Sequence, residues 1–328
     1  MAAGRTSKLR LSQEQIVVQI AVLAFVAFAA LVPNFLSTGN VIALIQNVSI
    51  LGILAMGMAI SIIGRGIDLS MVASMAVSVA WMLVELNAGR PIWEALTSSV
   101  IFSVVIGLIN GVLIAYVEVP AIFATLAMGT AVYGFGKVFL VSADVNYLPE
   151  SWKWLAILAT SRPLGVPMPV VFFLLVALMA HLFLRYSREG RFIYMMGDNP
   201  LAARTTGVPI RPLIVLQYVL TSLIALFAGL MMAMLVASMN TRIVSSTLVY
   251  DVILVVVLGG VGLSGGRGSI LSVVVGTLLI GILLNGMTMM DLTYTTQNVI
   301  KALILLLALL LDSFVNPRDE QTAQQGDI

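Results

Sequence analysis

The sequence predicts an all-α, polytopic membrane protein with about ten transmembrane helices, and three observations lead there. Hydrophobic residues make up 60% of the 328 residues and charged residues only 10%, whereas soluble domains carry about 25% charged residues. The mean hydropathy is +1.07. The apolar residues also gather in runs of the length that a bilayer-spanning helix requires.

These runs follow one another from residue 16 to residue 315, with polar connections between them. A helix is expected for each run because backbone polar groups inside a bilayer must find partners within the segment. Glycine and serine occur in several runs, as is typical where membrane helices approach closely. The expected spans are residues 16–32, 41–63, 69–86, 94–117, 120–141, 167–186, 212–238, 248–263, 269–290 and 297–315.

The distribution of Lys and Arg residues sets the expected orientation. With the N-terminus inside, 11 of the 17 Lys and Arg residues fall on the inner side. Inner loops of membrane proteins carry the excess of positive charge, so both termini are expected in the cytoplasm. The chain then divides into a cytoplasmic segment 1–15, a single transmembrane domain 16–315 and a cytoplasmic tail 316–328.

Two connections are long. Residues 142–166 are expected outside, where Trp152 and Trp154 favour an interfacial aromatic belt with a short amphipathic helix. Residues 187–211 are expected inside and contain "MGDNPLAARTTG". Asp198 or Asn199 can cap a short helix there, Pro200 suits its first position, and Gly207 suits the position after its end.

So short a helix is marginal in water by itself. It must therefore pack on a surface, either on the inner helices of this chain or on a cytoplasmic partner.

The stretch "IIGRGIDLSM" places two charges between the second and third spans. At the inner junction, Asp68 can cap the third span with Ser70 just behind it, and Arg65 follows the inner excess of positive charge. The alternative is a role for these charges in an inner gate or in signalling the state of an ATPase.

Residues 103–117 resemble residues 272–290, with Asn110-Gly111 matching Asn285-Gly286. The two segments are five spans apart and therefore run in opposite directions. This pattern is consistent with an inverted repeat of two five-helix halves, an arrangement that recurs in transporters.

Several chemistries are excluded. One histidine and no cysteine leave no zinc cluster, thiolate metal site or catalytic triad, so no metal site and no catalytic residue are expected. The chain carries no P-loop motif. The net charge of +2 gives no support for nucleic-acid binding. No acidic residue is expected at mid-membrane, which argues that another subunit supplies the energy for transport.

Amides in the spans could line a path for an uncharged solute. Their alternative role is interhelical hydrogen bonding, worth roughly 0.6 kcal/mol each. The candidates for the translocation path are Gln46, Asn47, Asn110, Asn285 and Asn298.

The chain resembles the ribose-type permeases, the membrane subunits of bacterial ATP-binding cassette (ABC) importers for monosaccharides. The resemblance runs from about residue 40 to residue 312. It rests on "GIDLS" (66–70), "VPAIFATLAMG" (119–129), "EGRFIYMMGDNPLAARTTGV" (189–208), "VLGGVGLSGGRGS" (257–269) and "KALILLLALLLD" (301–312). One departure is Arg65, which stands where the family pattern commonly has glycine.

The resemblance implies a permease subunit of the bacterial inner membrane that moves a monosaccharide or related small polar solute inward. Its implied partners are a second permease subunit (homo- or heterodimer), a cytoplasmic ABC ATPase, a periplasmic sugar-binding protein and membrane lipid. ATP and Mg²⁺ would bind the ATPase, so this chain would have no cofactor and would not be an enzyme. Residues 187–211 are similar to the family's coupling loop. The implied ATPase contacts are Gly190, Asp198, Asn199, Pro200, Ala203, Arg204 and Gly207.

Other functions remain open at the level of the sequence. An ABC permease for nucleosides or branched-chain amino acids would share the fold. A stand-alone secondary carrier would transport without ATP and would require a mid-membrane acid. An enzyme of the bilayer would require a nucleophile with its base.

Overall fold

The computed structural model describes residues 13–315, which are mostly helical. The expected tail 316–328 and most of segment 1–15 lie outside the described residues. The helices are α1 (Gln13–Leu31), α2 (Thr38–Ile63), α3 (Met71–Asn87), α4 (Ile92–Ala115), α5 (Ala121–Phe135), α6 (Ile157–Thr160), α7 (Met168–Tyr186), α8 (Arg188–Asp198), α9 (Pro200–Thr205), α10 (Ile210–Val236), α11 (Leu248–Leu258), α12 (Ile270–Met289) and α13 (Tyr294–Val315).

Short elements complete the described chain. A π-helical turn, η1 (Gly136–Leu140), extends α5. The 3-10 turns are η2 (Glu150–Ala156), η3 (Pro163–Gly165) and η4 (Thr241–Ser245). Strands β1 (Val145–Tyr147) and β2 (Ser238–Asn240) pair antiparallel, with Asn146 opposite Met239.

A helix occupies each of the ten positions at which the sequence predicts a span. By length and composition, 6 of the described helices suffice to cross a membrane: α2, α4, α5 with η1, α7, α10 and α12. Four further apolar helical stretches are shorter: Val17–Leu31 of α1, α3, α11 and Tyr294–Leu310 of α13. The chain is therefore a multi-pass membrane protein, and a total of ten crossings stays a prediction.

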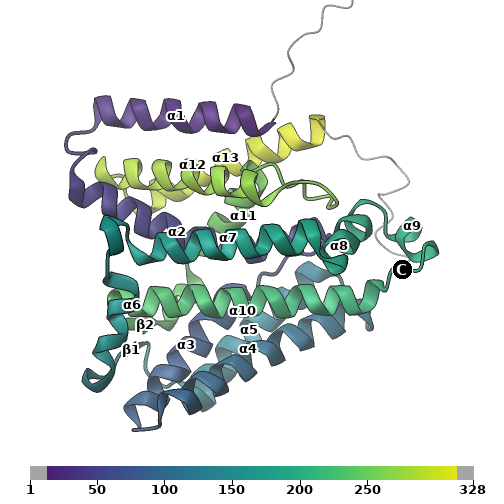
Figure 1. The fold of residues 1–328 in the computed structure, drawn as a ribbon, viewed down its shortest axis with the longest axis horizontal. Helices are drawn as coiled ribbons and strands as arrows, with labels where there is room; N and C mark the ends of the chain where they lie inside the picture. Colours follow the sequence, from purple (N-terminus) through teal and green to yellow (C-terminus); the bar gives the residue numbers. More distant parts are fainter. Residues whose placement is uncertain (1–12, 316–328) are drawn as a thin grey trace, which may run out of the picture.

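The long helices lie side by side, with α6, β1 and β2 at one end and α8 and α9 at the other (Figure 1). Helices α2 and α10 pack against each other near the middle of the molecule. The predicted helix in residues 142–166 is present as η2 and α6. The connections 142–166 and 187–211 therefore lie at opposite ends of the helical bundle.

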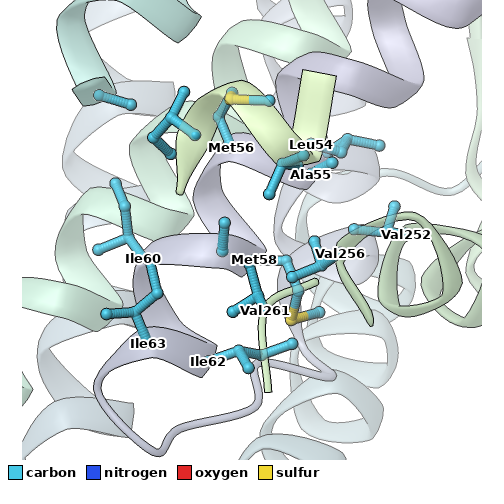
Figure 2. Packing of buried hydrophobic residues seen from close by; sticks show 14 of the residues in the cluster. Leu54, Ala55, Met56, Met58, Ile60, Ile62, Ile63, Val252, Val256 and Val261 are labelled. Atoms are coloured by element: carbon cyan, nitrogen blue, oxygen red, sulfur yellow. The ribbon is translucent and has the colours of Figure 1, made fainter. Parts of the chain in front are cut away.

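The core is centred on α2, in which every residue from Val48 to Ile63 is buried. Figure 2 shows Met58 and Ile62 of α2 beside Val256 of α11 and Val261 of the following loop. Lipid tails are as apolar as these side chains, so close packing rather than escape from water stabilises the contact. Residues 64–70 connect α2 to α3, so α2 ends where predicted and α3 begins two residues later than predicted.

The helix packing repeats between the two halves of the chain. Helix α4 packs on α10 and α3, while α12 packs on α2 and α11. Helix α3 also contacts α5 and α10, while α11 contacts α13 and α2. Each of these four contacts of α3 and α4 has a counterpart among the contacts of α11 and α12, five predicted spans away.

Candidate functional site

The segment that follows α7 is built by two side-chain caps. The Ser187 hydroxyl accepts a hydrogen bond of 2.8 Å from the Gly190 N–H and begins α8. The Asn199 side chain accepts one of 3.0 Å from the Ala202 N–H and begins α9, with Pro200 at its first position. Gly207 follows α9 with φ of +82°, a conformation that glycine adopts without steric cost. The predicted short helix is therefore present, and Asn199 rather than Asp198 caps it.

Side chains of α9 divide between solvent and the interior of the chain. Leu201 is 67% exposed and Arg204 is also exposed, whereas Ala203 is only 2% exposed and packs in the core around α2. The 187–211 segment thus rests on this chain's own helices and leaves one side of α9 open. Asp198, Asn199 and Gly207 are likewise exposed.

Two of the implied ATPase-contact residues, Gly190 and Ala203, are buried within this chain. A side chain at Gly190 would overlap the backbone of Phe183 and Leu184, so this glycine lets α8 turn tightly against α7. Ala203 faces inward in the same way. Gly190 and Ala203 therefore shape the segment from within, and a contact of either residue with an ATPase stays a prediction.

Arg65 ties the α2–α3 connection to this segment. Its Nε donates to the Gly197 carbonyl at 2.6 Å and its Nη2 to the Asp198 carbonyl at 2.8 Å. The last carbonyls of a helix have no partner within the helix, so the guanidinium caps the C-terminal end of α8. The loop between α11 and α12, residues 259–269, is rich in glycine and is called the glycine-rich loop. Its Gly266 N–H also donates to the Ile63 carbonyl at 2.7 Å. Three segments distant in sequence thus meet at Arg65.

Asp68 orders the turn that precedes α3 through contacts with Ser70, whereas the N-terminal end of α3 at Ser70 has no side-chain cap of the kind predicted for Asp68. Its Oδ1 accepts from the Ser70 N–H at 2.9 Å and from the Ser70 hydroxyl at 2.6 Å. The Asn110 amide of α4 donates to that hydroxyl at 2.8 Å. Burial raises the pKa of Asp68 to about 6, against the opposing effect of the hydrogen bonds from Ser70. The Asn110 amide nitrogen therefore joins the inner junction, and a place for Asn110 in the translocation path stays a prediction.

The other path candidates do not converge. Asn285 exchanges two hydrogen bonds with Asn40, of 2.8 Å and 3.0 Å, which join α12 to α2. Asn298 accepts from the Thr247 hydroxyl at 3.3 Å and joins α13 to the start of α11. Gln46 is half-buried and Asn47 is exposed on α2. The structure thus favours interhelical hydrogen bonding for Asn110, Asn285 and Asn298.

Uncharged polar groups are buried between α2, α3, α4 and α10. The Ser61 and Thr221 hydroxyls are 2.9 Å apart, and the Ser103 hydroxyl donates to the Ser222 carbonyl at 2.8 Å. Within the described residues, several such buried side-chain atoms have no hydrogen-bond partner. Apart from Asp68 Oδ2, they are Ser74 Oγ, Ser78 Oγ, Asn110 Oδ1, Tyr218 Oη and Ser222 Oγ.

Sequence reasoning missed an ion pair near the other end of the bundle. Lys301 Nζ lies 2.8 Å from Asp251 Oδ1 and 2.9 Å from the Thr247 hydroxyl, and Lys301 is only 8% exposed. Both charges were visible in apolar runs, but no spacing rule pairs residues 50 positions apart. The pair joins α11 to α13 and removes two charges from contact with lipid.

Among residues 13–315, no group of three or more His, Asp or Glu side chains could hold a metal ion. The exposed part of α9 is a feature of the site that is open to a partner.

Comparison with known proteins shows which proteins this chain is similar to. The sequence profile of a family described as "Branched-chain amino acid transport system / permease component" matches residues 40–309. The ribose import permease protein RbsC of Escherichia coli is 34% identical over 301 residues, 90% of this chain and 92% of that protein.

Two further relatives come from the same organism. The galactofuranose transporter permease protein YtfT is 30% identical over 84% of this chain and 80% of its own length. The L-arabinose transport system permease protein AraH is 30% identical over 88% of this chain and 87% of its own length. No solved structure matches the chain significantly.

Proposed function

This chain belongs to the family of branched-chain amino acid transport system permease components, and from that premise we propose that it is the membrane subunit of an ATP-driven importer for a monosaccharide or related small polar solute. The observation that carries the proposal is the similarity over nine-tenths of the chain to a ribose permease.

The proposed substrate class agrees with the polar groups inside the bundle. Sugars are neutral and present hydroxyl groups, which hydroxyl and amide side chains can bind without a charge. The buried atoms that lack partners on α3, α4 and α10 are almost all of this kind. A branched-chain amino acid would require groups for a carboxylate and an ammonium. The family description names that substrate, but the relatives reported above carry names of sugar permeases.

The proposed partner at the α8–α9 end is a cytoplasmic ABC ATPase, which would bind ATP and Mg²⁺ and carry out the hydrolysis. The exposed residues Leu201, Arg204 and Asn199 support a contact there, since a partner reaches them without unfolding the segment. Asp198, Pro200 and Gly207 would complete the contact. A second permease subunit and a periplasmic sugar-binding protein complete the proposed importer.

This assignment places α8 and α9 in the cytoplasm and the β1–β2 pair on the periplasmic side of a bacterial inner membrane. The excess of Lys and Arg at the α8–α9 end supports that orientation. Both termini would then be cytoplasmic.

We also infer that the two halves of the bundle form an inverted repeat. The matched packing of α4 on α10 and α12 on α2 supports it. The backbone conformation after four helices also supports the repeat. A non-glycine residue with positive φ follows each of α2, α4, α10 and α12; these residues are, in order, Arg65, Glu118, Ala237 and Asp291. Such residues are uncommon, and these four fall at positions five predicted spans apart.

Reconstitution tests the proposed function. In proteoliposomes that contain this chain, the ATPase and the binding protein, we expect uptake of one of ribose, L-arabinose or galactofuranose only when ATP is present. The control replaces the ATPase with a variant that binds but does not hydrolyse ATP. Uptake without the ATPase would favour a secondary carrier, and uptake of amino acids alone would favour the second substrate class.

A further inference from the structure

A cavity of about 340 Å³ lies where α7, α8 and the start of α12 meet. His181 and Arg185 of α7 line it, together with Arg191 and Tyr194 of α8. Ser269 and Ile270 close it from α12. The Tyr194 hydroxyl donates a hydrogen bond of 2.8 Å to the Gly268 carbonyl, which holds α8 against the glycine-rich loop at one side of the cavity.

The cavity is positively charged. Arg185 and Arg191 both line it, and within the described residues neither forms an ion pair with a carboxylate. Arg191 Nη1 donates to the Tyr186 carbonyl at 3.1 Å, which orients its guanidinium and leaves further N–H donors. The N-terminal end of α12 adds the positive end of a 20-residue helix dipole.

The cavity also borders the surface that faces lipid. His181 and Arg185 share one face of α7 with Leu178 and Leu182, because residues three, four and seven apart lie on the same side of a helix. Leu178 is 52% exposed and Leu182 is 45% exposed. An apolar stripe thus leads along α7 directly to the two basic side chains at its end.

We propose that this cavity binds the phosphate group of an anionic phospholipid, with Arg185 and Arg191 donating to the phosphate oxygens and the acyl chains lying along Leu178 and Leu182. Basic pockets between helices on the cytoplasmic side of membrane proteins suit such headgroups. A soluble phosphate has no apolar part that could contact Leu178 and Leu182, whereas a phospholipid has acyl chains that can. The bound lipid would fix α8, which continues directly into α9. The site is independent of which solute the protein transports.

Native mass spectrometry of the full chain tests the site, with phosphatidylglycerol and phosphatidylcholine as probes. We expect the chain to retain phosphatidylglycerol in preference to phosphatidylcholine. Arg185→Gln and Arg191→Gln should each reduce phosphatidylglycerol retention about tenfold, the value of one lost charge-assisted contact. Arg185→Lys should restore part of it.

Arg188→Gln is the matched control. Arg188 lies on the same helix as Arg191 but does not line the cavity. Its guanidinium carbon is 5.1 Å from the centroid of the Phe192 ring, much as that of Arg185 is 5.9 Å from the centroid of the Tyr186 ring. Gel filtration checks that each variant is folded.

Three outcomes would overturn the proposal. One is equal retention of the two lipids, and another is a loss in Arg188→Gln as large as that in Arg185→Gln. The third is displacement of phosphatidylglycerol by millimolar inorganic phosphate, which would make the ligand a soluble anion.

Discussion

Arg65 combines two features that a single residue rarely has. Its φ of +67° is in the left-handed region, which costs a residue with a Cβ atom about 1–3 kcal/mol. Its guanidinium meanwhile holds the final carbonyls of α8. Glycine would relieve the backbone and lose the contact, so the presence of arginine indicates that the side-chain contact outweighs the strain.

A pair of substitutions separates these effects. We expect both Arg65→Ala and Arg65→Gly to lower the amount of solute taken up per ATP hydrolysed, because each frees α8 from the α2–α3 connection. Arg65→Gly should be the more stable of the two by about 1 kcal/mol, since glycine adopts this φ freely. Thermal unfolding in detergent and coupled uptake measure the two quantities. Full uptake in both variants would contradict the role given to the guanidinium.

At the scale of the element, α9 shows how burial separates neighbouring residues of one motif. Arg204 is exposed while Ala203, the residue before it, is buried. The cap at Asn199 and the stop at Gly207 follow local rules that sequence reasoning can apply. The direction that each side chain faces follows from the packing of α9 on α8 and α10, which those rules do not contain.

The exposed and buried positions of α9 should respond differently to a new negative charge. Arg204→Asp is expected to leave the thermal midpoint within a few degrees and to reduce ATPase binding and uptake together. Ala203→Glu is expected to lower the midpoint itself, because it buries an unpaired charge in the core. Co-purification of the ATPase and thermal unfolding measure both effects. Retained ATPase binding in Arg204→Asp would remove this residue from the contact.

The other end of the bundle is held by a carboxylate with two cations. Asp144 Oδ1 lies 2.8 Å from Lys137 Nζ, and its Oδ2 lies 2.7 Å from an Arg242 guanidinium nitrogen. The hydrogen bonds from Lys137 and then Arg242 lower the pKa of Asp144. The cluster thereby fixes the β1–β2 pair to the end of α5.

Because the pKa of Asp144 is lowered, the stabilisation that its contacts with Lys137 and Arg242 give to the folded chain depends on pH in a defined direction. It is present above the unfolded pKa of aspartate, about 4, and is lost as the pH falls through the lower folded value. Asp144→Asn should therefore lower the thermal midpoint at pH 7, and the difference from the unaltered chain should shrink below about pH 4. Glu150→Gln is the control, since its ion pair with Lys153 is exposed and contributes little. A difference that persists at low pH would rule out the ionised form as the cause.

At the scale of the whole molecule, opposite ends of the bundle present the two long connections. One end of the bundle faces the cytoplasm and the other faces the periplasm. The orientation in the membrane therefore decides which partner can reach which connection. The chain has no cysteine, which makes single-cysteine labelling direct.

Cysteine labelling should show the orientation. With a maleimide that does not cross membranes, we expect Leu164→Cys to react in intact cells and Leu201→Cys to react only after lysis. Both side chains are well exposed in the structure, so accessibility within the protein does not distinguish them. The reverse pattern would place α9 in the periplasm and would contradict docking of an ATPase there.

The sequence by itself determined the features that depend on neighbouring residues: the apolar runs that become helices, the cap and the end of α9, and the turn between α2 and α3. Only the tertiary structure decided the pairing of Lys301 with Asp251, the contact of Arg65 with α8, and the inward direction of Gly190 and Ala203. Each of these joins helices far apart in the chain. In a bilayer, where almost every helix is apolar on all sides, hydrophobic periodicity does not report which face meets which neighbour. Close packing and hydrogen-bond geometry make that choice, and they act only once the helices are assembled.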